Sequence, residues 1–131
     1  MLFIYASILQ AQQPDTSDAR YRPLLHFTPK ANWMNDPNGM VYYKGTYHLF
    51  YQYYPNGNVW GPMHWGHVSS EDMVTWRREP IAMAPSIEAD RDGVFSGSAV
   101  VSDDNQLVAY YTGHRWRNGV NEDEGNLQVQ C

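Results

Sequence analysis

The chain has 131 residues, a length typical of about one domain. Aromatic residues make up 15% of it and the formal net charge is −5. Because proteins that bind nucleic acids need clustered Lys and Arg to meet the phosphates, this composition argues against a nucleic-acid partner. No stretch reaches the roughly 18 to 20 apolar residues that a membrane-spanning helix needs, so we expect no membrane partner either.

The first 22 residues differ in character from the rest of the chain. LFIYASILQAQQ (2–13) predicts a short helix, and the Pro- and Asp-containing stretch after it predicts a linker. A secretory leader is the alternative, with Ala11 at the end of a cleavage site, but no Lys or Arg precedes the apolar run. We therefore expect an N-terminal helix or leader plus linker at 1–22 and a folded domain at 23–131.

Strand-like alternation with a period of two begins at Met40. Lys44-Gly45 separates two such runs, which predicts a β-hairpin with a two-residue turn. Two further strands complete a four-stranded sheet, and Ser69 or Ser70 is placed to cap a helical turn between them. The expected strands lie at 40–43, 46–53, about 65–69 and 75–79, and the helical turn lies at 71–73.

The same layout then begins again. VFSGSAVV (94–101) and QLVAYYTG (106–113) flank the polar turn SDDN, about 58 residues after the corresponding elements of the first sheet. Repeated four-stranded units predict an all-β fold built as propeller blades, since one blade cannot bury both of its faces. Fewer than two complete blades cannot close a ring, so we expect about two blades of a larger propeller, an N-terminal fragment.

The stretch WMNDPNG (33–39) admits two interpretations. Asp-Pro-Asn-Gly is typical of a turn, because Pro37 presets φ and Gly39 accepts positive φ without steric cost. A carboxylate placed to attack a substrate is the other interpretation of Asp36. The stretch alone favours the turn.

Four stretches follow one another along the chain: WMNDPNG (33–39), HLFYQYYP (48–55), WGPMHWGHVSSEDMVTW (60–76) and DGVFSGSAVV (92–101). In this order they resemble the first third of glycoside hydrolase family 32, the β-fructofuranosidases. The resemblance covers roughly residues 21–131 and is nearest to the sucrose and sucrose-6-phosphate hydrolases (invertases), which carry similar WGPMHWGH, YTGH and VQC stretches.

This resemblance implies a five-bladed β-propeller with the active site at its central funnel, followed by a β-sandwich. It also implies that Asp36 is the nucleophile, which attacks the anomeric carbon of fructose and forms a covalent fructosyl-enzyme that water releases with retention. Retaining glycosidases need two carboxyl groups about 5 to 5.5 Å apart, one ionised and one protonated. Asp36 stands beside Asn35 and backbone amides that can donate hydrogen bonds, which suits the ionised member.

Sugar-contacting residues are implied from both blades. Gln52 would hydrogen-bond fructose hydroxyls; a polar residue facing solvent at a strand end is the alternative. Trp60 would form an apolar wall, since aromatic faces stack on sugars, with a packed loop anchor as the alternative. The implied set consists of Trp33, Met34 and Asn35, which flank the nucleophile, with Gln52, Trp60, Phe95 and Ser96.

The general acid is not found in this sequence. In the family it is a Glu before Cys, and a stabilising Asp lies in an Arg-Asp-Pro motif, both later in the chain. Arg91-Asp92 is followed by Gly rather than Pro, and Cys131 is preceded by Gln130. We therefore expect the acid/base beyond Cys131 and an incomplete, inactive site.

No metal or cofactor is expected. His64 and His67 are three residues apart in a strand and therefore point to opposite faces, which prevents them from sharing a zinc ion. The acidic run 122–124 lacks the spacing of oxygen ligands in calcium sites. The remaining histidines, His114 among them, are expected to be hydrogen-bonded structural groups.

The leading hypothesis is a β-fructofuranosidase that acts on sucrose or sucrose-6-phosphate. The alternatives are a non-catalytic sugar-binding β-module, a fructan hydrolase (levanase or inulinase), and a truncated product with open strand edges and no stable fold. The single Cys131 gives no sign of an oxidising compartment, and we expect a cytoplasmic location, with secretion as the alternative. The sequence predicts no oligomeric state.

Overall fold

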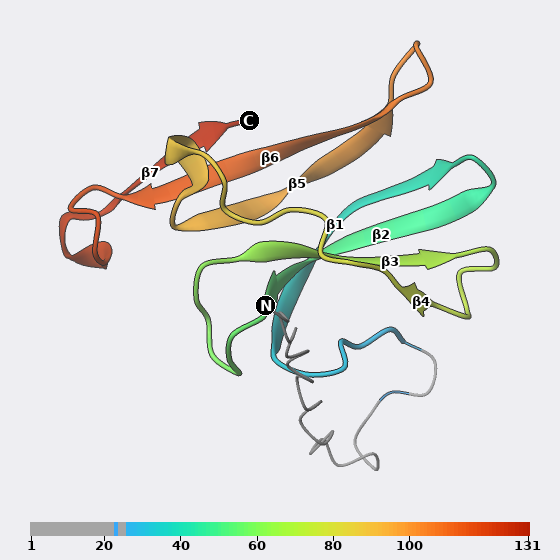
Figure 1. The fold of residues 1–131 in the computed structure, drawn as a ribbon, viewed down its shortest axis with the longest axis horizontal. Helices are drawn as coiled ribbons and strands as arrows, with labels where there is room; N and C mark the ends of the chain where they lie inside the picture. The colour runs from blue at the N-terminus through green and yellow to red at the C-terminus, as the bar shows by residue number, and fades with distance from the viewer. Residues whose placement is uncertain (1–22, 24–25) are drawn as a thin grey trace, which may run out of the picture.

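The computed structural model describes residue 23 and residues 26–131, so the helix or leader expected at 1–22 lies outside the described residues. Two antiparallel sheets make up the fold, in the orders β1-β2-β3-β4 and β5-β6-β7 (Figure 1). We call them sheet A and sheet B. The expectation of an all-β chain is confirmed. The strands are β1 (Trp33–Tyr43), β2 (Thr46–Tyr54), β3 (His64–Ser70), β4 (Arg77–Arg78), β5 (Gly93–Val101), β6 (Leu107–Trp116) and β7 (Asn126–Gln130), with 3-10 turns η2 (Glu88–Asp90) and η3 (Glu122–Glu124).

The expected hairpin is present. Lys44 and Gly45 join β1 to β2 with φ of 48° and 85°, the positive values that a tight two-residue hairpin turn requires at both positions. The helical turn expected at 71–73 is absent, because Met73 has a φ of 60° and cannot continue a right-handed helix. Ser70 Oγ instead accepts hydrogen bonds from the backbone N–H groups of Asp72 and Met73. The fourth strand is also shorter than predicted, covering Arg77–Arg78 alone.

The stretch 33–39 is not a turn, which corrects the interpretation favoured by its composition. It lies inside β1, with irregular register against β2: Met34 is opposite Tyr53 and Pro37 is opposite Tyr51. Asn35 and Asp36 together therefore face a single residue of β2, which is a β-bulge. Pro is tolerated here because β1 is the edge strand of sheet A and because bulges leave a backbone N–H unpaired.

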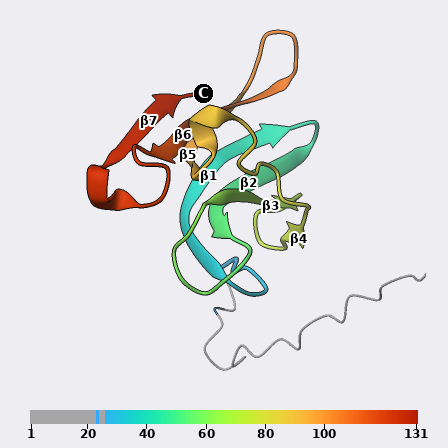
Figure 2. The same ribbon diagram turned by 60° about the vertical axis from the view of Figure 1, so that its left-hand side comes forward.

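The hydrophobic core lies between the two sheets. Its buried members are Phe50 and Trp65 from sheet A and Val94 and Ala99 from sheet B, and Trp65 has no exposed surface. Strand β1 runs alongside β5, as both views show (Figures 1 and 2). Gly39 makes this approach possible, because a Cβ there would lie 2.8 Å from the Ala99 Cβ.

Sheet A also holds β5 by hydrogen bonds. The backbone N–H of Val94 donates to the carbonyl of Met63 at 2.8 Å, and the Gln52 Nε2 donates to the Val94 carbonyl at 3.0 Å. The indole N–H of Trp65 donates to the carbonyl of Phe95 at 3.0 Å. The first residues of β5 are thus fixed against sheet A just before Ser96.

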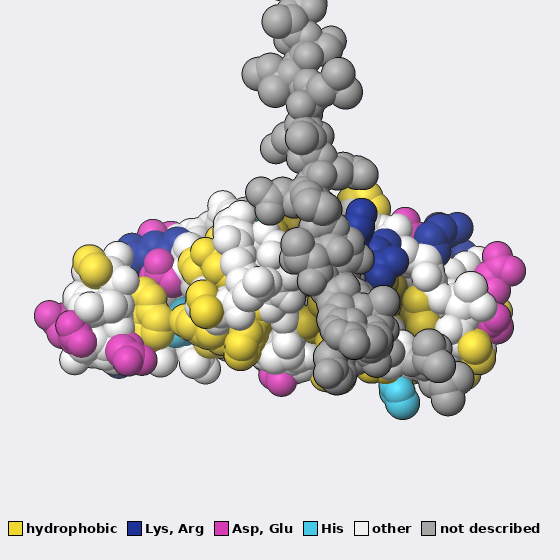
Figure 3. Space-filling view, turned by 90° about the horizontal axis from the view of Figure 1, so that it is seen from below, with side chains coloured by type: hydrophobic (Ala, Val, Ile, Leu, Met, Phe, Trp, Pro, Cys, Tyr) yellow, Lys and Arg dark blue, Asp and Glu magenta, His cyan; other side chains and the backbone are white. Residues whose placement is uncertain are grey.

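One face of the molecule is partly apolar. Seen from below, hydrophobic side chains gather left of the middle of this face, and acidic side chains lie mostly toward its two ends (Figure 3). Within the part of the chain that the structure describes, no helix is long and apolar enough to cross a bilayer.

Candidate active site

Asp36 and Ser96 meet across the two sheets. The Ser96 Oγ donates a hydrogen bond of 2.9 Å to the Asp36 Oδ2, although the residues are 60 positions apart. Ser96 is itself a bulge residue, because Phe95 pairs with Thr112 whereas Gly97 pairs with the adjacent Tyr111. Bulges redirect side chains and recur next to active sites. Here two bulges on neighbouring strands point a carboxylate and a hydroxyl at each other.

The Asp36 carboxylate keeps one oxygen available. Asp36 is exposed, and among the described residues its carboxylate accepts a hydrogen bond from Ser96. That bond occupies Oδ2, so Oδ1 is not engaged by any hydrogen bond within the described chain. Such a carboxylate can act as a nucleophile or as a hydrogen-bond acceptor for a polar ligand.

Two buried amide side chains, Gln52 and Asn38, connect the strands that carry this pair. Gln52 is 2% exposed, so it does not face solvent at a strand end. Asn38, also 2% exposed, has its amide oxygen 3.0 Å from the Gln52 Nε2 and 3.2 Å from the Trp65 Nε1 when the amide is oriented to satisfy its neighbours. Gln52 thus links β1, β2 and β5, and its amide nitrogen is already engaged.

Four aromatic rings, one of them that of Phe95 just before Ser96 in the sequence, contact one another and form what we call the aromatic cluster. The Trp60 ring lies 6.0 Å from the Phe95 ring and 6.2 Å from the Trp116 ring. The His114 ring stacks on Phe95 at 4.1 Å and meets Trp116 edge-on at 4.5 Å. Trp60 is 45% exposed, so one side of the cluster is open to a ligand.

The other predicted residues around the nucleophile are placed differently. The Trp33 indole N–H donates to the Asn35 Oδ1 at 2.8 Å, which orients both side chains near the bulge. Met34 and Asn35 line a groove of about 400 Å³ together with Phe27 and Tyr51. Asp36 and Ser96 do not line this groove. The structure thus pairs Asp36 with Ser96 and Phe95 with Trp60, whereas Met34 and Asn35 line the groove.

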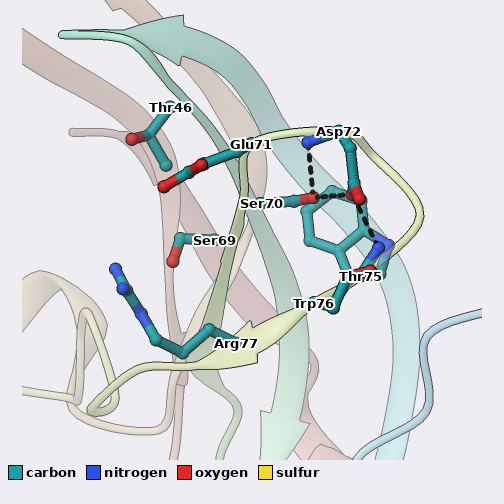
Figure 4. Close-up of a pocket in the computed structure, with 8 residues that line it drawn as sticks. All are labelled: Thr46, Ser69, Ser70, Glu71, Asp72, Thr75, Trp76 and Arg77. Atoms are coloured by element: carbon teal, nitrogen blue, oxygen red, sulfur yellow. Dashed lines mark hydrogen bonds between the residues drawn. The ribbon is translucent and has the colours of Figure 1, made fainter.

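A larger cavity of about 550 Å³ lies at another place on sheet A (Figure 4). Its Asp72 carboxylate accepts from the N–H groups of Thr75 and Val74, which lower the pKa of Asp72 to about 2. None of the predicted site residues lies in it. The lining residues are Thr46, Ser69, Ser70, Glu71, Asp72, Thr75, Trp76 and Arg77.

The histidines have separate environments. The His64 Nδ1 lies 3.0 Å from the Pro62 carbonyl, whereas the His67 Nε2 lies 3.0 Å from the His48 Nδ1. His114 differs from the expectation of a hydrogen-bonded group, because neither ring nitrogen has a partner in the described chain. Burial lowers the pKa of His114, and the Asp92 carboxylate opposes this only in part, so its ring is neutral.

Asp92 and Cys131 lie in stretches that resemble the family's Arg-Asp-Pro and Glu-Cys motifs without matching them, and both make structural contacts. The Asp92 Oδ2 accepts from the backbone N–H of Trp116 at 2.7 Å, which fixes the end of β6. Cys131 pairs with Tyr111 through two backbone hydrogen bonds of 2.8 and 3.0 Å.

Sequence reasoning missed three residues of this region. The sequence suggests only a turn-forming role for Asn38. In the structure Asn38 lies within β1, and its buried amide contacts the buried Gln52. His114 and Trp116 follow the aromatic-rich strand 106–113, and their alternation on β6 places both on the face of Phe95. That alternation is the signal that would have found them.

Comparison with known proteins gives the family. The model of the glycosyl hydrolases family 32 N-terminal domain matches residues 26–131. The Escherichia coli sucrose-6-phosphate hydrolase is 52% identical over 112 residues, covering 85% of this chain and 23% of the relative. The levanase of Bacillus subtilis (strain 168) is 54% identical over 113 residues, covering 86% of this chain and 16% of the relative.

Solved structures of the same family resemble this fold. The Bombyx mori GH32 beta-fructofuranosidase BmSUC1 superposes with a TM-score of 0.72 at 48% identity, over 86% of this chain and 23% of that one. A mutant of the same enzyme has been solved in complex with sucrose. The chain spans about a quarter or less of the length of these relatives. With its two sheets corresponding to the N-terminal part of their β-propeller, the chain belongs to glycoside hydrolase family 32.

Proposed function

We propose that the protein to which these residues belong is a β-fructofuranosidase that cleaves terminal β-D-fructofuranosyl bonds of sucrose or sucrose-6-phosphate. The single observation that supports it most is the exposed Asp36 carboxylate, which Ser96 holds through Oδ2 while Oδ1 is not engaged by any hydrogen bond within the described residues. The relatives named above carry sucrose-6-phosphate hydrolase, levanase and beta-fructofuranosidase activities in their names.

In this proposal Asp36 performs a double displacement. Its Oδ1 attacks the anomeric carbon of the fructosyl unit as the bond to the leaving oxygen breaks, and a protonated carboxyl group gives that oxygen its proton. Water then attacks the same carbon, returns the proton to the second carboxyl group and restores the Asp36 carboxylate, so the configuration is retained. The Ser96 hydroxyl fixes the carboxylate orientation in both steps.

The second carboxyl group is proposed to come from sequence outside these residues. Asp92 is bound to the Trp116 backbone, and Ser96 is the group that hydrogen-bonds Asp36 in the described chain. The chain by itself is therefore proposed to be inactive. Its contribution is the nucleophile and part of the sugar-binding wall.

The sugar-contacting set is proposed with roles adjusted to the geometry. Ser96, which contacts Asp36, and the paired rings of Trp60 and Phe95 are the proposed direct contacts of the sugar. Gln52, being 2% exposed, reaches the sugar only through its free carbonyl oxygen, since Nε2 binds the Val94 carbonyl. Trp33, Met34 and Asn35 flank the nucleophile at the rim.

A chimera tests this function. This chain replaces the segment that it matches in the Escherichia coli sucrose-6-phosphate hydrolase, which supplies the remaining sequence. The chimera is expected to release fructose from sucrose and sucrose-6-phosphate, and to form the β-methyl fructoside when methanol competes with water. A folded chimera that binds fructosides without turnover would instead favour the sugar-binding module, and preferred cleavage of levan or inulin would favour the fructan hydrolase.

Replacing Ser96 with Ala in the chimera is expected to lower kcat/KM by about 10- to 100-fold, because hydrogen bonds to charged groups contribute about 1.5 to 3 kcal/mol. The nearby Ser98 is exposed on the same strand, and Ser98→Ala is the matched control. Steady-state kinetics on sucrose gives the comparison. Equal activities of the two variants would show that Ser96 does not orient Asp36.

We also propose the division at residues 22 and 23 and a cytoplasmic location. Similarity to the Escherichia coli sucrose-6-phosphate hydrolase and a single cysteine support that location. Fractionation of cells that produce the protein, followed by mass measurement of its N-terminus, tests both. Recovery from the medium with a shortened N-terminus would favour a secreted protein.

A further inference from the structure

His114 is the buried member of the aromatic cluster. Only 1% of it is exposed, compared with 45% of Trp60 at the open side. Its ring is nearly parallel to that of Phe95, with an interplanar angle of 8° and 4.1 Å between centroids. Against Trp116 it is nearly perpendicular, at 87° and 4.5 Å. Both are geometries that aromatic pairs favour.

Trp60 depends on the two rings that contact His114. It lies in the loop before β3, and its ring meets Phe95 at 78° and Trp116 at 60°. Each ring of the cluster therefore contacts two others, in the order Trp60, Phe95, His114, Trp116 and back to Trp60. Removal of the buried ring would leave Phe95 and Trp116 without a shared support.

The backbones on either side are fixed independently of the rings. The Trp116 N–H donates to the Asp92 Oδ2 at 2.7 Å, and its carbonyl accepts from the Arg91 Nη2 at 3.1 Å. His114 pairs with Gly93 across β5 and β6. A substitution of the His114 side chain is therefore expected to leave the strands in place and to change the ring orientations.

His114 contributes through its flat shape rather than through its polarity. Neither nitrogen has a hydrogen-bond partner within the described chain, and burial lowers its pKa, so an uncharged ring packs there. A phenyl ring offers the same flat faces. A side chain without a ring offers none.

We propose that His114 is a positioning residue that holds Phe95 and Trp116, and through them Trp60, as the wall against which the sugar binds. The use of this wall by a fructoside rests on the proposed function. The dependence of the Trp60 ring orientation on His114 is independent of the proposed function.

Kinetics of the chimera tests the first part. His114→Ala is expected to raise KM for sucrose about 3- to 10-fold with kcat changed less than about twofold, since a wall that only binds the sugar contributes equally to substrate and transition state. His114→Phe is expected to keep KM within about twofold. Because the effect passes through Trp60, His114→Ala is expected to add little to Trp60→Ala in a double-mutant cycle.

His67→Ala is the matched control. The His67 ring also stacks on an aromatic ring, that of Phe50 at 4.6 Å and 24°, but lies in sheet A outside the aromatic cluster. A purely structural loss lowers the amount of folded enzyme and leaves KM unchanged, which is the result expected for His67→Ala. An unchanged KM in His114→Ala, or effects of His114→Ala and Trp60→Ala that simply add, would overturn the proposal.

A measurement without sugar separates this inference from the function. With 5-fluorotryptophan incorporated and resonances assigned from Trp60→Phe and Trp116→Phe, His114→Ala is expected to shift the ¹⁹F signals of Trp60 and Trp116. His114→Phe is expected to shift Trp60 little, and His67→Ala to leave both in place. If these shifts appear but no fructoside is hydrolysed, the proposed function fails and the positioning role stands; if the Trp60 signal does not respond to His114→Ala, the positioning role fails.

Discussion

Replacing Asp36 with Asn is expected to lower kcat of the chimera on sucrose by at least about ten-thousand-fold, the scale seen when a covalent nucleophile is removed. Asn has nearly the same shape and keeps an oxygen that accepts from the Ser96 Oγ, so the geometry of the two bulges is preserved. What is lost is the negatively charged carboxylate oxygen that forms the bond to the anomeric carbon. Initial-rate kinetics at saturating sucrose measures this loss.

Binding of the sugar is expected to survive the same change. The dissociation constant of sucrose for Asp36→Asn, measured by calorimetry, should stay within about threefold of the parent chimera, because the aromatic wall and Ser96 remain. Asp92→Asn is the matched control at the Arg-Asp look-alike, and its kcat should stay within about tenfold since Asp92 binds only the end of β6 and Arg91. Near-normal turnover of Asp36→Asn would show that another group is the nucleophile.

The sequence predicted the first hairpin well because its signals are local. Alternation and the Lys44-Gly45 pair are sufficient to define the first hairpin, and positive φ at both residues is what that turn requires. The 71–73 helical turn failed because Ser70 and Asp72 offer the backbone competing hydrogen bonds. The residue types show that side chains can compete with helical hydrogen bonds here. Whether the helical turn or the side-chain bonds form depends on the strand that follows.

The conformation of the stretch 33–39 was mistaken for a different reason. Residues that form turns also suit a bulged edge strand, and residue types alone do not distinguish the two. The distinction comes from β2, which pairs with β1 along its whole length, and from β5, which places Ser96 against Asp36. The assignment of Asp36 came from an ordered series of motifs, whereas its contact with Ser96 is a consequence of packing between sheets.

The aromatic cluster could not be predicted from single positions. The sequence favours a hydrogen-bonded His114 because buried polar groups are usually paired. Its stacking on Phe95 depends on the register of β5 against β6, in which a bulge at Ser96 changes the facing pairs. A shift of one residue would have turned Phe95 to the other face of the sheet.

Gly39→Ala is expected to destabilise the protein by about 3 kcal/mol, the sum of a strained backbone and an overpacked sheet contact. The φ of Gly39 is +45°, and a Cβ there would lie 2.8 Å from the Ala99 Cβ and 2.9 Å from the Ala99 nitrogen. Neither neighbour is a flexible side chain, so β1 and β5 must move apart. Urea unfolding of the chimera measures the loss.

Gly45→Ala separates the two contributions. Gly45 has a φ of +85°, and a Cβ there would have nothing within 4 Å, so the substitution carries only the backbone strain, about 1 kcal/mol. Equal destabilisation by the two variants would show that the sheets do not press together at Gly39. If Gly39→Ala costs more, its kcat/KM should also fall while that of Gly45→Ala does not. The losses of stability and of activity are expected together because the new methyl group pushes apart the two strands that carry Asp36 and Ser96. Asp36 lies three residues before Gly39, and Ser96 lies three residues before Ala99.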